Sequence, residues 1–126
     1  MQPIHITIED AGLAFTASLK DTPTAEHIRA ILPLEGRAQL WGDEIYFDIP
    51  LHIDLEPNAK ADVAVGDLGY WPAGPAFCIF FGPTPISAGA NPKAYSPVNI
   101  FGKIAGDLTA LKSTPAGAVV RVTAAL

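Results

Sequence analysis

Residues 66–87 read GDLGYWPAGPAFCIFFGPTPIS, and this stretch decides the fold. Six consecutive apolar residues, 76–81, lie between clusters of glycine and proline. A short apolar run with such boundaries is typical of a strand that is buried on both faces. We therefore expect residues 76–81 to be the central strand of a small β protein, enclosed on one side and covered on the other.

Alternating apolar and polar residues predict further strands on both sides of this segment. Residues 4–8 and 13–19 alternate with period 2 around a turn, which predicts an opening hairpin with the isoleucines inward. Residues 38–40 and 44–49 predict a second hairpin around the turn at Trp41-Gly42-Asp43. Other strands are expected at residues 51–55, 63–65, 99–104 and 118–124.

Helix signals occur at two places. Thr22 can cap a helix with Pro23 in its first turn, and Pro33 ends it, so we expect a helix over residues 23–32. Asp107 predicts a second short helix over residues 107–112. With 126 residues the chain suits a single domain, and this pattern predicts a mainly β, up-and-down or mixed barrel with the two helices at its ends.

Two motifs carry a family resemblance. GPAFCIFFGPTP (74–85) and VNIFGKIAGDLTAL (98–111) resemble a core strand and a later strand of the cyclophilins, which are peptidyl-prolyl isomerases. A closer similarity, through residues 58–85 and the motif at 96–104, is to a prokaryotic family of small cyclophilin-like proteins of unassigned function. The resemblance covers about residues 36–123. It implies a closed cyclophilin-like β-barrel capped by two short helices and implies no established activity.

The chain lacks the residues that the resemblance would require for catalysis. Cyclophilins place an essential arginine ahead of a segment that resembles Gly66-Asp67, but no arginine lies between Arg37 and Arg121. No glutamine follows Gln39, and Val98 stands where cyclophilins have a histidine. An isomerase lowers a barrier of about 18–20 kcal/mol by polarising the prolyl amide. We therefore expect a non-catalytic binding module, the alternative being a weak or atypical peptidyl-prolyl isomerase.

Candidate binding residues flank the central strand. Tyr70 and Trp71 precede it, and a Gly/Pro/Ser/Asn-rich loop expected over residues 82–97 follows it. Long loops are often functional, and ligand pockets combine aromatic walls with a few polar groups. A small molecule or a peptide end is the expected ligand, although Trp71 could instead be a structural plug over the barrel mouth. The candidate ligand-binding residues are Tyr70, Trp71, Thr84, Ser87, Tyr95 and Ser96.

Other reactive residue types have structural interpretations. Cys78 lies within the apolar strand, where burial raises a thiol pKa, so it is expected to be core rather than a nucleophile. Asp43 is expected in a turn, and Glu44 and Asp48 are expected to be outward strand residues rather than a catalytic pair. No metal or cofactor is expected, because no pair has metal-ligand spacing among His5, His27 and His52.

Charge and composition limit the partners and the compartment. The formal net charge of −5 comes without a basic face, so a nucleic-acid partner is not expected. No apolar stretch approaches the roughly 18 residues that span a bilayer, so a membrane partner is not expected either. A single cysteine and the absence of a signal-peptide pattern at the start lead us to expect a cytoplasmic protein. The sequence does not decide the oligomeric state, and a dimer that pairs through exposed strand edges is one alternative.

Overall fold

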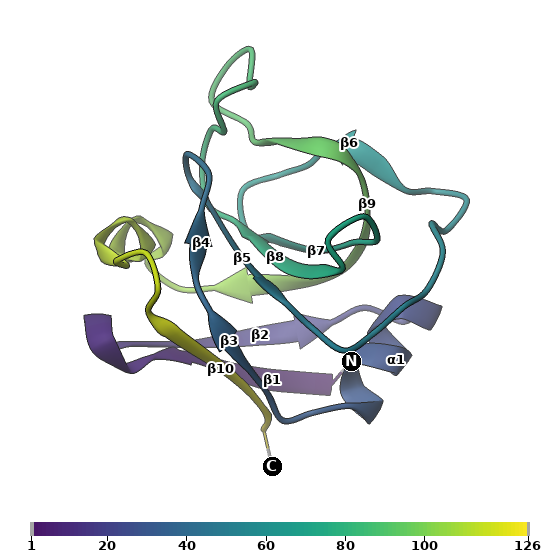
Figure 1. Cartoon of the computed structure of the whole chain (residues 1–126), viewed down its shortest axis with the longest axis horizontal. Coiled ribbons are helices and arrows are strands. Elements are labelled where there is room, and N and C mark those ends of the chain that lie inside the picture. The colour runs from purple at the N-terminus through teal and green to yellow at the C-terminus, as the bar shows by residue number, and fades with distance from the viewer. Residues whose placement is uncertain (1, 126) are drawn as a thin grey trace.

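The computed structural model describes residues 2–125, which form ten strands, one α-helix and two 3₁₀ helices (Figure 1). In chain order the elements are β1 (Gln2–Ile8), η1 (Glu9–Ala11), β2 (Leu13–Leu19), α1 (Pro23–Ala30), β3 (Leu34–Arg37), β4 (Gln39–Leu40), β5 (Glu44–Asp48), β6 (Lys60–Asp62), β7 (Asp67–Trp71), β8 (Ala76–Phe80), β9 (Lys93–Ala105), η2 (Leu108–Ser113) and β10 (Val119–Ala124). Within this part of the chain no helix is both long and apolar enough to cross a membrane.

The strands form a curved sheet that remains open. Hydrogen bonding links them in the order β3-β10-β1-β2-β9-β7-β8-β5-β4, and β6 pairs with β9 beside this path. The two ends, β3 and β4, are not joined by any ladder within residues 2–125. The closed barrel that the family resemblance implied is therefore wrong, because the ladder stops at these two edges.

A side chain lies at the place where the ladder is interrupted. Gly36 of β3 already pairs on one side with Val120 of β10. The ring of Phe47 from β5 lies against the face of Gly36, so close that a Cβ on Gly36 would be 2.6 Å from Phe47 Cδ2. β3 and β5 are therefore in contact through an aromatic ring packed on backbone, and no ladder joins them within residues 2–125.

Both predicted hairpins are confirmed. β1 and β2 pair antiparallel from Gln2 opposite Leu19 to Ile8 opposite Leu13, and the three isoleucines of β1 are fully buried. β4 and β5 form the second hairpin, with Leu40 opposite Ile45. Period-2 alternation identified β1, β2 and β5 because it places every second side chain of these strands in the main core.

The central strand is also confirmed, and it separates two apolar clusters. All five residues of β8 are buried. Phe77 and Ile79 belong to the main core, which is also lined by β1, β2 and β10. Ala76, Cys78 and Phe80 point to the opposite face and belong to a second cluster with Val63, Ala94 and Val98. The sheet therefore needs a cover on that second face.

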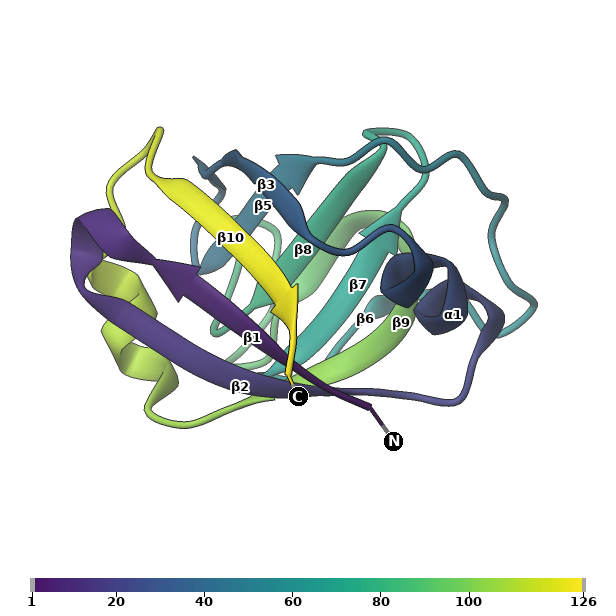
Figure 2. The same ribbon diagram turned by 90° about the horizontal axis from the view of Figure 1, so that it is seen from below.

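The first part of β9 provides this cover. β9 is 13 residues long, and it pairs with β2, β7 and β6 along its length. Figures 1 and 2 show it curving away from the β1–β2 layer so that it lies with β6 opposite β7 and β8. Gly69 of β7 permits the close approach, because a Cβ there would be 2.9 Å from Cγ2 of Val98.

The strand expected over residues 51–55 is absent, and side chains hold this segment instead. The Tyr70 hydroxyl donates to the Leu51 carbonyl at 2.6 Å. Asn99 Nδ2 donates to the Asp54 carbonyl at 3.0 Å. These bonds satisfy buried backbone groups one at a time, so the segment does not need a neighbouring strand.

Three other boundaries differ from the predictions. The strand expected at 63–65 lies instead at β6, and the 82–97 loop ends earlier because β9 begins at Lys93. α1 is capped by Thr22 Oγ1, which accepts from Ala25 N at 3.1 Å, and it ends at Ala30, two residues short of the prediction. η2 confirms the second short helix as a 3₁₀ helix capped by Asp107.

Candidate ligand pocket

A pocket lies on the face of the sheet that points away from the main core. Strand register explains which side chains reach it, because Tyr46 of β5 and Gly69 of β7 both stand opposite Cys78 of β8. Side chains two residues apart share a face, so Glu44 and Trp71 point to the same side as Tyr46 and Cys78. β9 covers this side.

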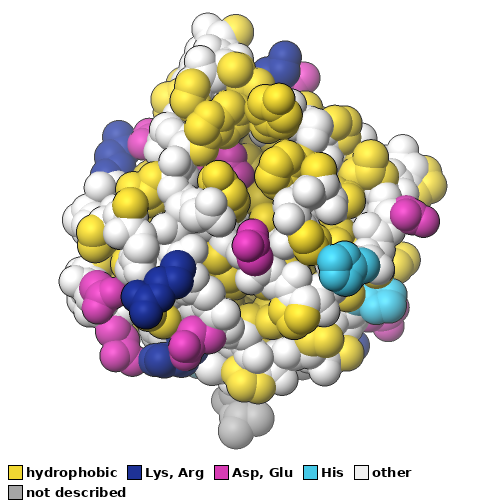
Figure 3. Space-filling model, in the orientation of Figure 1, with side chains coloured by type: hydrophobic (Ala, Val, Ile, Leu, Met, Phe, Trp, Pro, Cys, Tyr) yellow, Lys and Arg dark blue, Asp and Glu magenta, His cyan; other side chains and the backbone are white. Residues whose placement is uncertain are grey.

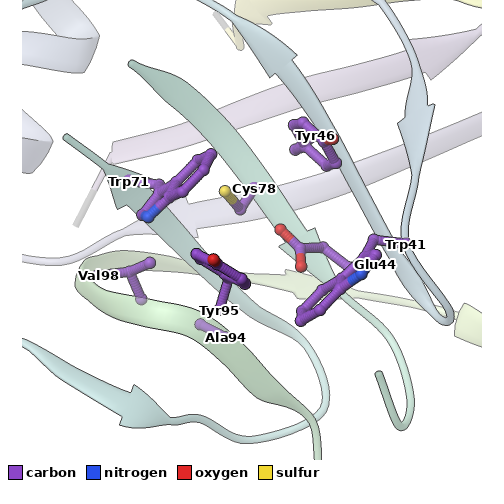
Figure 4. A pocket seen from close by; sticks show the side chains of 8 residues that line it. All are labelled: Trp41, Glu44, Tyr46, Trp71, Cys78, Ala94, Tyr95 and Val98. Atoms are coloured by element: carbon purple, nitrogen blue, oxygen red, sulfur yellow. The ribbon is translucent and has the colours of Figure 1, made fainter. Parts of the chain in front are cut away.

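The pocket has a volume of about 160 Å³. A cavity of roughly 150 Å³ can hold a benzene molecule, so the size suits a small ligand or one group of a larger one. Figure 3 shows hydrophobic side chains gathered around acidic atoms in a hollow on the upper half of this face. The lining residues, drawn in Figure 4, are Trp41, Glu44, Tyr46, Trp71, Cys78, Ala94, Tyr95 and Val98.

Four aromatic rings form most of the wall. Tyr95 stands edge-on to both tryptophans, with ring centroids 6.0 Å from Trp41 at 74° and 6.1 Å from Trp71 at 78°. Trp71 in turn meets Tyr46 at 6.4 Å and 82°. Edge-to-face contacts of this kind are favourable for aromatic pairs. The indole N–H of Trp71 also donates to Ser96 Oγ at 2.6 Å, which fixes the orientation of this ring.

Glu44 supplies the charged group of the pocket. It is only 6% exposed, although the sequence pattern predicted an outward, solvated side chain. That prediction is wrong because β9 covers the outer face. Figure 4 shows the carboxyl group pointing into the space between Trp41, Tyr46 and Tyr95. Burial raises the pKa of Glu44 to about 7, and a hydrogen bond from the Cys78 thiol offsets part of this rise.

Cys78 lies at the base of the pocket. It is 1% exposed, which confirms the prediction of a packed core residue. Burial raises the pKa of its thiol well above the usual value, and the neighbouring Glu44 raises it further. The thiol is therefore protonated at neutral pH, and its proton can be shared with the Ala76 carbonyl, 3.9 Å from Sγ. A protonated thiol is a poor nucleophile.

The structure separates the six residues that were predicted to bind a ligand. Trp71 and Tyr95 line the pocket, and Ser96 touches it through the bond to Trp71. Tyr70 is fully buried in the main core. Thr84 and Ser87 hold the loop before β9: Ser87 Oγ accepts from Thr84 N at 2.9 Å, and Thr84 Oγ1 donates to the Lys93 carbonyl at 2.5 Å. Ligand binding by any of the six stays a prediction.

Sequence reasoning missed Trp41, Glu44 and Tyr46. Trp41 was assigned to a turn, Glu44 was expected to point outward, and Tyr46 was treated only as part of the hairpin strand. One signal was available: residues 76–81 are apolar on both faces, so the strand paired with them must also have a covered outer face. Alternation alone does not say which strand provides that cover.

Elsewhere, the described residues offer less to a ligand. No group of three or more histidine, cysteine, aspartate or glutamate residues within 2–125 could hold a metal ion. A second hollow, of about 500 Å³, lies beside the 88–93 segment and β6. Its Asp67 is already engaged, because it accepts from Ala64 N at 2.8 Å and pairs with Lys103 at 3.6 Å.

Comparisons with known proteins agree with the sheet topology. The family model described as cyclophilin-like matches residues 2–123. The solution structure of the hypothetical protein AF2241 from Archaeoglobus fulgidus is 34% identical in sequence, with a TM-score of 0.79. That match covers 98% of this chain and 95% of the archaeal one.

A more distant similarity extends to a larger protein. The structure of McbB in complex with tryptophan matches 95% of this chain with a TM-score of 0.70 and 19% identity, which indicates a shared fold alone. This chain spans 44% of McbB. A search of curated proteins finds no match. Because the family model and the archaeal relative both match nearly the whole length, the chain belongs to the cyclophilin-like family.

Proposed function

We propose that this protein is a non-catalytic binding module that takes a small organic molecule into the aromatic pocket. The observation that carries the proposal is a hollow of about 160 Å³ with four aromatic walls and one buried carboxyl group. Pockets with apolar walls and few polar groups are the usual form of small-molecule sites. The aromatic walls give affinity through contact area, and Glu44 gives orientation.

The packing around Trp71 supports a binding role rather than a plug. Trp71 is only half-buried, and its polar edge is occupied by Ser96. Trp71 packs against the apolar cluster formed around Cys78 and Phe80, and the pocket remains as a hollow beside this contact. Tyr95 stands at the rim with 73% of its surface exposed, so the site is open to entry.

The non-catalytic part of the proposal rests on the position of the cations. Arg121 lies on β10 and pairs with Glu9 at 2.6 Å and Glu35 at 2.9 Å. Arg37 donates to the Gly117 carbonyl at 3.2 Å. Neither is a lining residue of the pocket, so neither could polarise a prolyl amide bound there.

Both tryptophans of the chain line the pocket, which provides a direct test of binding. In ¹H–¹⁵N spectra the two indole N–H signals should shift together when small aromatic fragments, such as indole or phenol, are added. Trp71→Leu should remove one signal and weaken binding. If fragments leave both indole signals unchanged, or bind equally well to Trp71→Leu, the proposed function is wrong.

An isomerase assay tests the other half of the proposal. Exchange measurements on an Ala-Pro peptide should show no acceleration above the uncatalysed rate. Acceleration comparable to that of a true cyclophilin at equal concentration would overturn the non-catalytic assignment and favour an atypical peptidyl-prolyl isomerase.

A further inference from the structure

The chemistry of the pocket is unusual in its charge. Four of the eight lining residues are aromatic, three are small or apolar, and the remaining one is Glu44. None of the eight is basic. Among the residues that the structure describes, no lysine, arginine or histidine forms an ion pair with Glu44. The nearest acidic neighbour in sequence, Asp43, has its own partner in Lys112 at 3.7 Å.

We propose that the ligand of this pocket carries a methylated ammonium group, held by the aromatic faces with Glu44 as its counter-ion. This inference rests on the proposed function, since it names the class of ligand for the same site. A buried carboxylate without a positively charged partner is costly, and a cationic ligand removes that cost by supplying the missing charge.

The aromatic geometry suits a cation. Cation–π attraction acts when the cation lies within about 6 Å of a ring centroid, over the ring face. Successive centroids in the row Trp41, Tyr95, Trp71 and Tyr46 are 6.0–6.4 Å apart, so a cation within this range of one ring can also be within this range of its neighbour. Each ring is turned by 74–82° from the next, so the rings surround the space from different directions.

The polar groups favour a methylated cation over a bare ammonium. A primary ammonium group brings three N–H donors that need acceptors. Glu44 is the one charged acceptor among the lining side chains, and the other oxygen acceptors are the hydroxyls of Tyr46 and Tyr95, which belong to separate strands and would all have to converge on the nitrogen. A quaternary ammonium has no N–H to satisfy, and its methyl groups can contact Ala94 and Val98 as well as the rings. A bare metal ion fits poorly, because a metal site needs several ligating groups.

Glu44 must be ionised for this role, and its surroundings decide when it is. The titratable groups that face it are Cys78 from β8, Tyr95 from β9 and Tyr46 from its own strand, and burial raises the pKa of the Cys78 thiol, which therefore carries no charge near pH 7. The ionised fraction of Glu44 in the empty pocket therefore rises through a pKa of about 7. The affinity for a cation should therefore increase between pH 6 and pH 8, as the ionised fraction of Glu44 increases.

A matched pair of ligands tests the charge directly. Choline and 3,3-dimethylbutan-1-ol have the same shape, but the second replaces the quaternary nitrogen with carbon. Titrations followed by tryptophan fluorescence at pH 8 should show choline binding at least tenfold more tightly than the neutral alcohol. Glu44→Gln should lower choline affinity at least tenfold, bring the two ligands close together and remove the pH dependence. Glu26 is an exposed glutamate on α1, so Glu26→Gln is the matched control and should leave the affinity for both ligands unchanged.

Each outcome separates the two proposals. If the alcohol binds as tightly as choline, or if Glu44→Gln binds choline like the unaltered protein, the cation inference is overturned while the binding function stands. If choline fails to bind but indole or phenol shifts the indole signals, the same conclusion holds. If choline, the alcohol and the aromatic fragments all fail to bind, both proposals are overturned.

Discussion

Tyr70 and Trp71 are consecutive residues of β7, and their side chains lie on opposite faces of the sheet. Tyr70 is fully buried in the main core, where its hydroxyl donates to the Leu51 carbonyl at 2.6 Å. Trp71 lines the pocket and donates to Ser96 at 2.6 Å. Because side chains alternate along a strand, one residue of the pair stabilises the fold and the other builds the candidate site.

This division predicts different costs for removing the two polar contacts. Tyr70→Phe leaves the Leu51 carbonyl without its buried partner and should lower the free energy of unfolding by about 1–3 kcal/mol. Trp71→Phe removes a hydrogen bond from a half-buried residue and should cost less than Tyr70→Phe. Urea unfolding of both variants checks the order. A larger loss for Trp71→Phe would mean that Trp71 is a structural plug.

Glu44 should make stability depend on pH. Its pKa is about 7 in the folded chain against an ordinary value of 4.5, so between these pH values the folded state holds more protons than the unfolded state. The free energy of unfolding should therefore fall as pH rises from 4.5 to 7, and this contribution should be constant above pH 7. At about 1.4 kcal/mol per pH unit, the total fall is at most about 3.5 kcal/mol.

Glu44→Gln should remove this fall and make the protein more stable than the unaltered chain at pH 8. Glu26 is exposed, so Glu26→Gln should keep the original pH dependence of the free energy of unfolding. Urea unfolding at pH 5 and pH 8 gives the comparison. If Glu44→Gln shows the same loss between these pH values as the unaltered protein, Glu44 is not the group responsible.

Cys78 should be protected from thiol reagents. The side chain is 1% exposed and burial raises the pKa of its thiol, so the folded protein should react with iodoacetamide far more slowly than the urea-unfolded chain at the same pH. Mass spectrometry of the labelled protein measures both rates. Rapid labelling of the folded protein at neutral pH would instead indicate a reactive thiol at the base of the pocket.

Gly36 should resist substitution because of its contact with Phe47. An added Cβ would lie 2.6 Å from the ring, so Gly36→Ala should lower the free energy of unfolding by about 1–3 kcal/mol. Gly89 has nothing within 4 Å of an added Cβ, and Gly89→Ala should change stability by less than about 0.5 kcal/mol. Thermal unfolding of the two variants provides the test, and equal effects would argue against the ring-to-backbone contact between β3 and β5.

The local pattern of residues in the sequence was sufficient to predict the secondary structure near the core. Alternation of apolar and polar residues identified the β1–β2 hairpin, because successive side chains of a strand point to opposite faces. The unbroken apolar run identified β8, because both faces of this strand are buried. Thr22 and Asp107 marked both later helices by their capping chemistry. The prediction of a strand over residues 51–55 was wrong. The segment alternates like a strand, but its carbonyls accept hydrogen bonds from the side chains of Tyr70 and Asn99 and not from the backbone of a neighbouring strand.

The sequence by itself therefore determined the family, the mainly β character and the two-sided burial of β8. Tertiary structure alone decided that the sheet stays open and that Glu44 faces an aromatic pocket. Both depend on how separate strands pair and pack: no ladder joins the edge strands β3 and β4 within residues 2–125, and β9 folds over β5, β7 and β8. Alternation reveals which side chains share a face, but the element that covers this face is set by long-range packing.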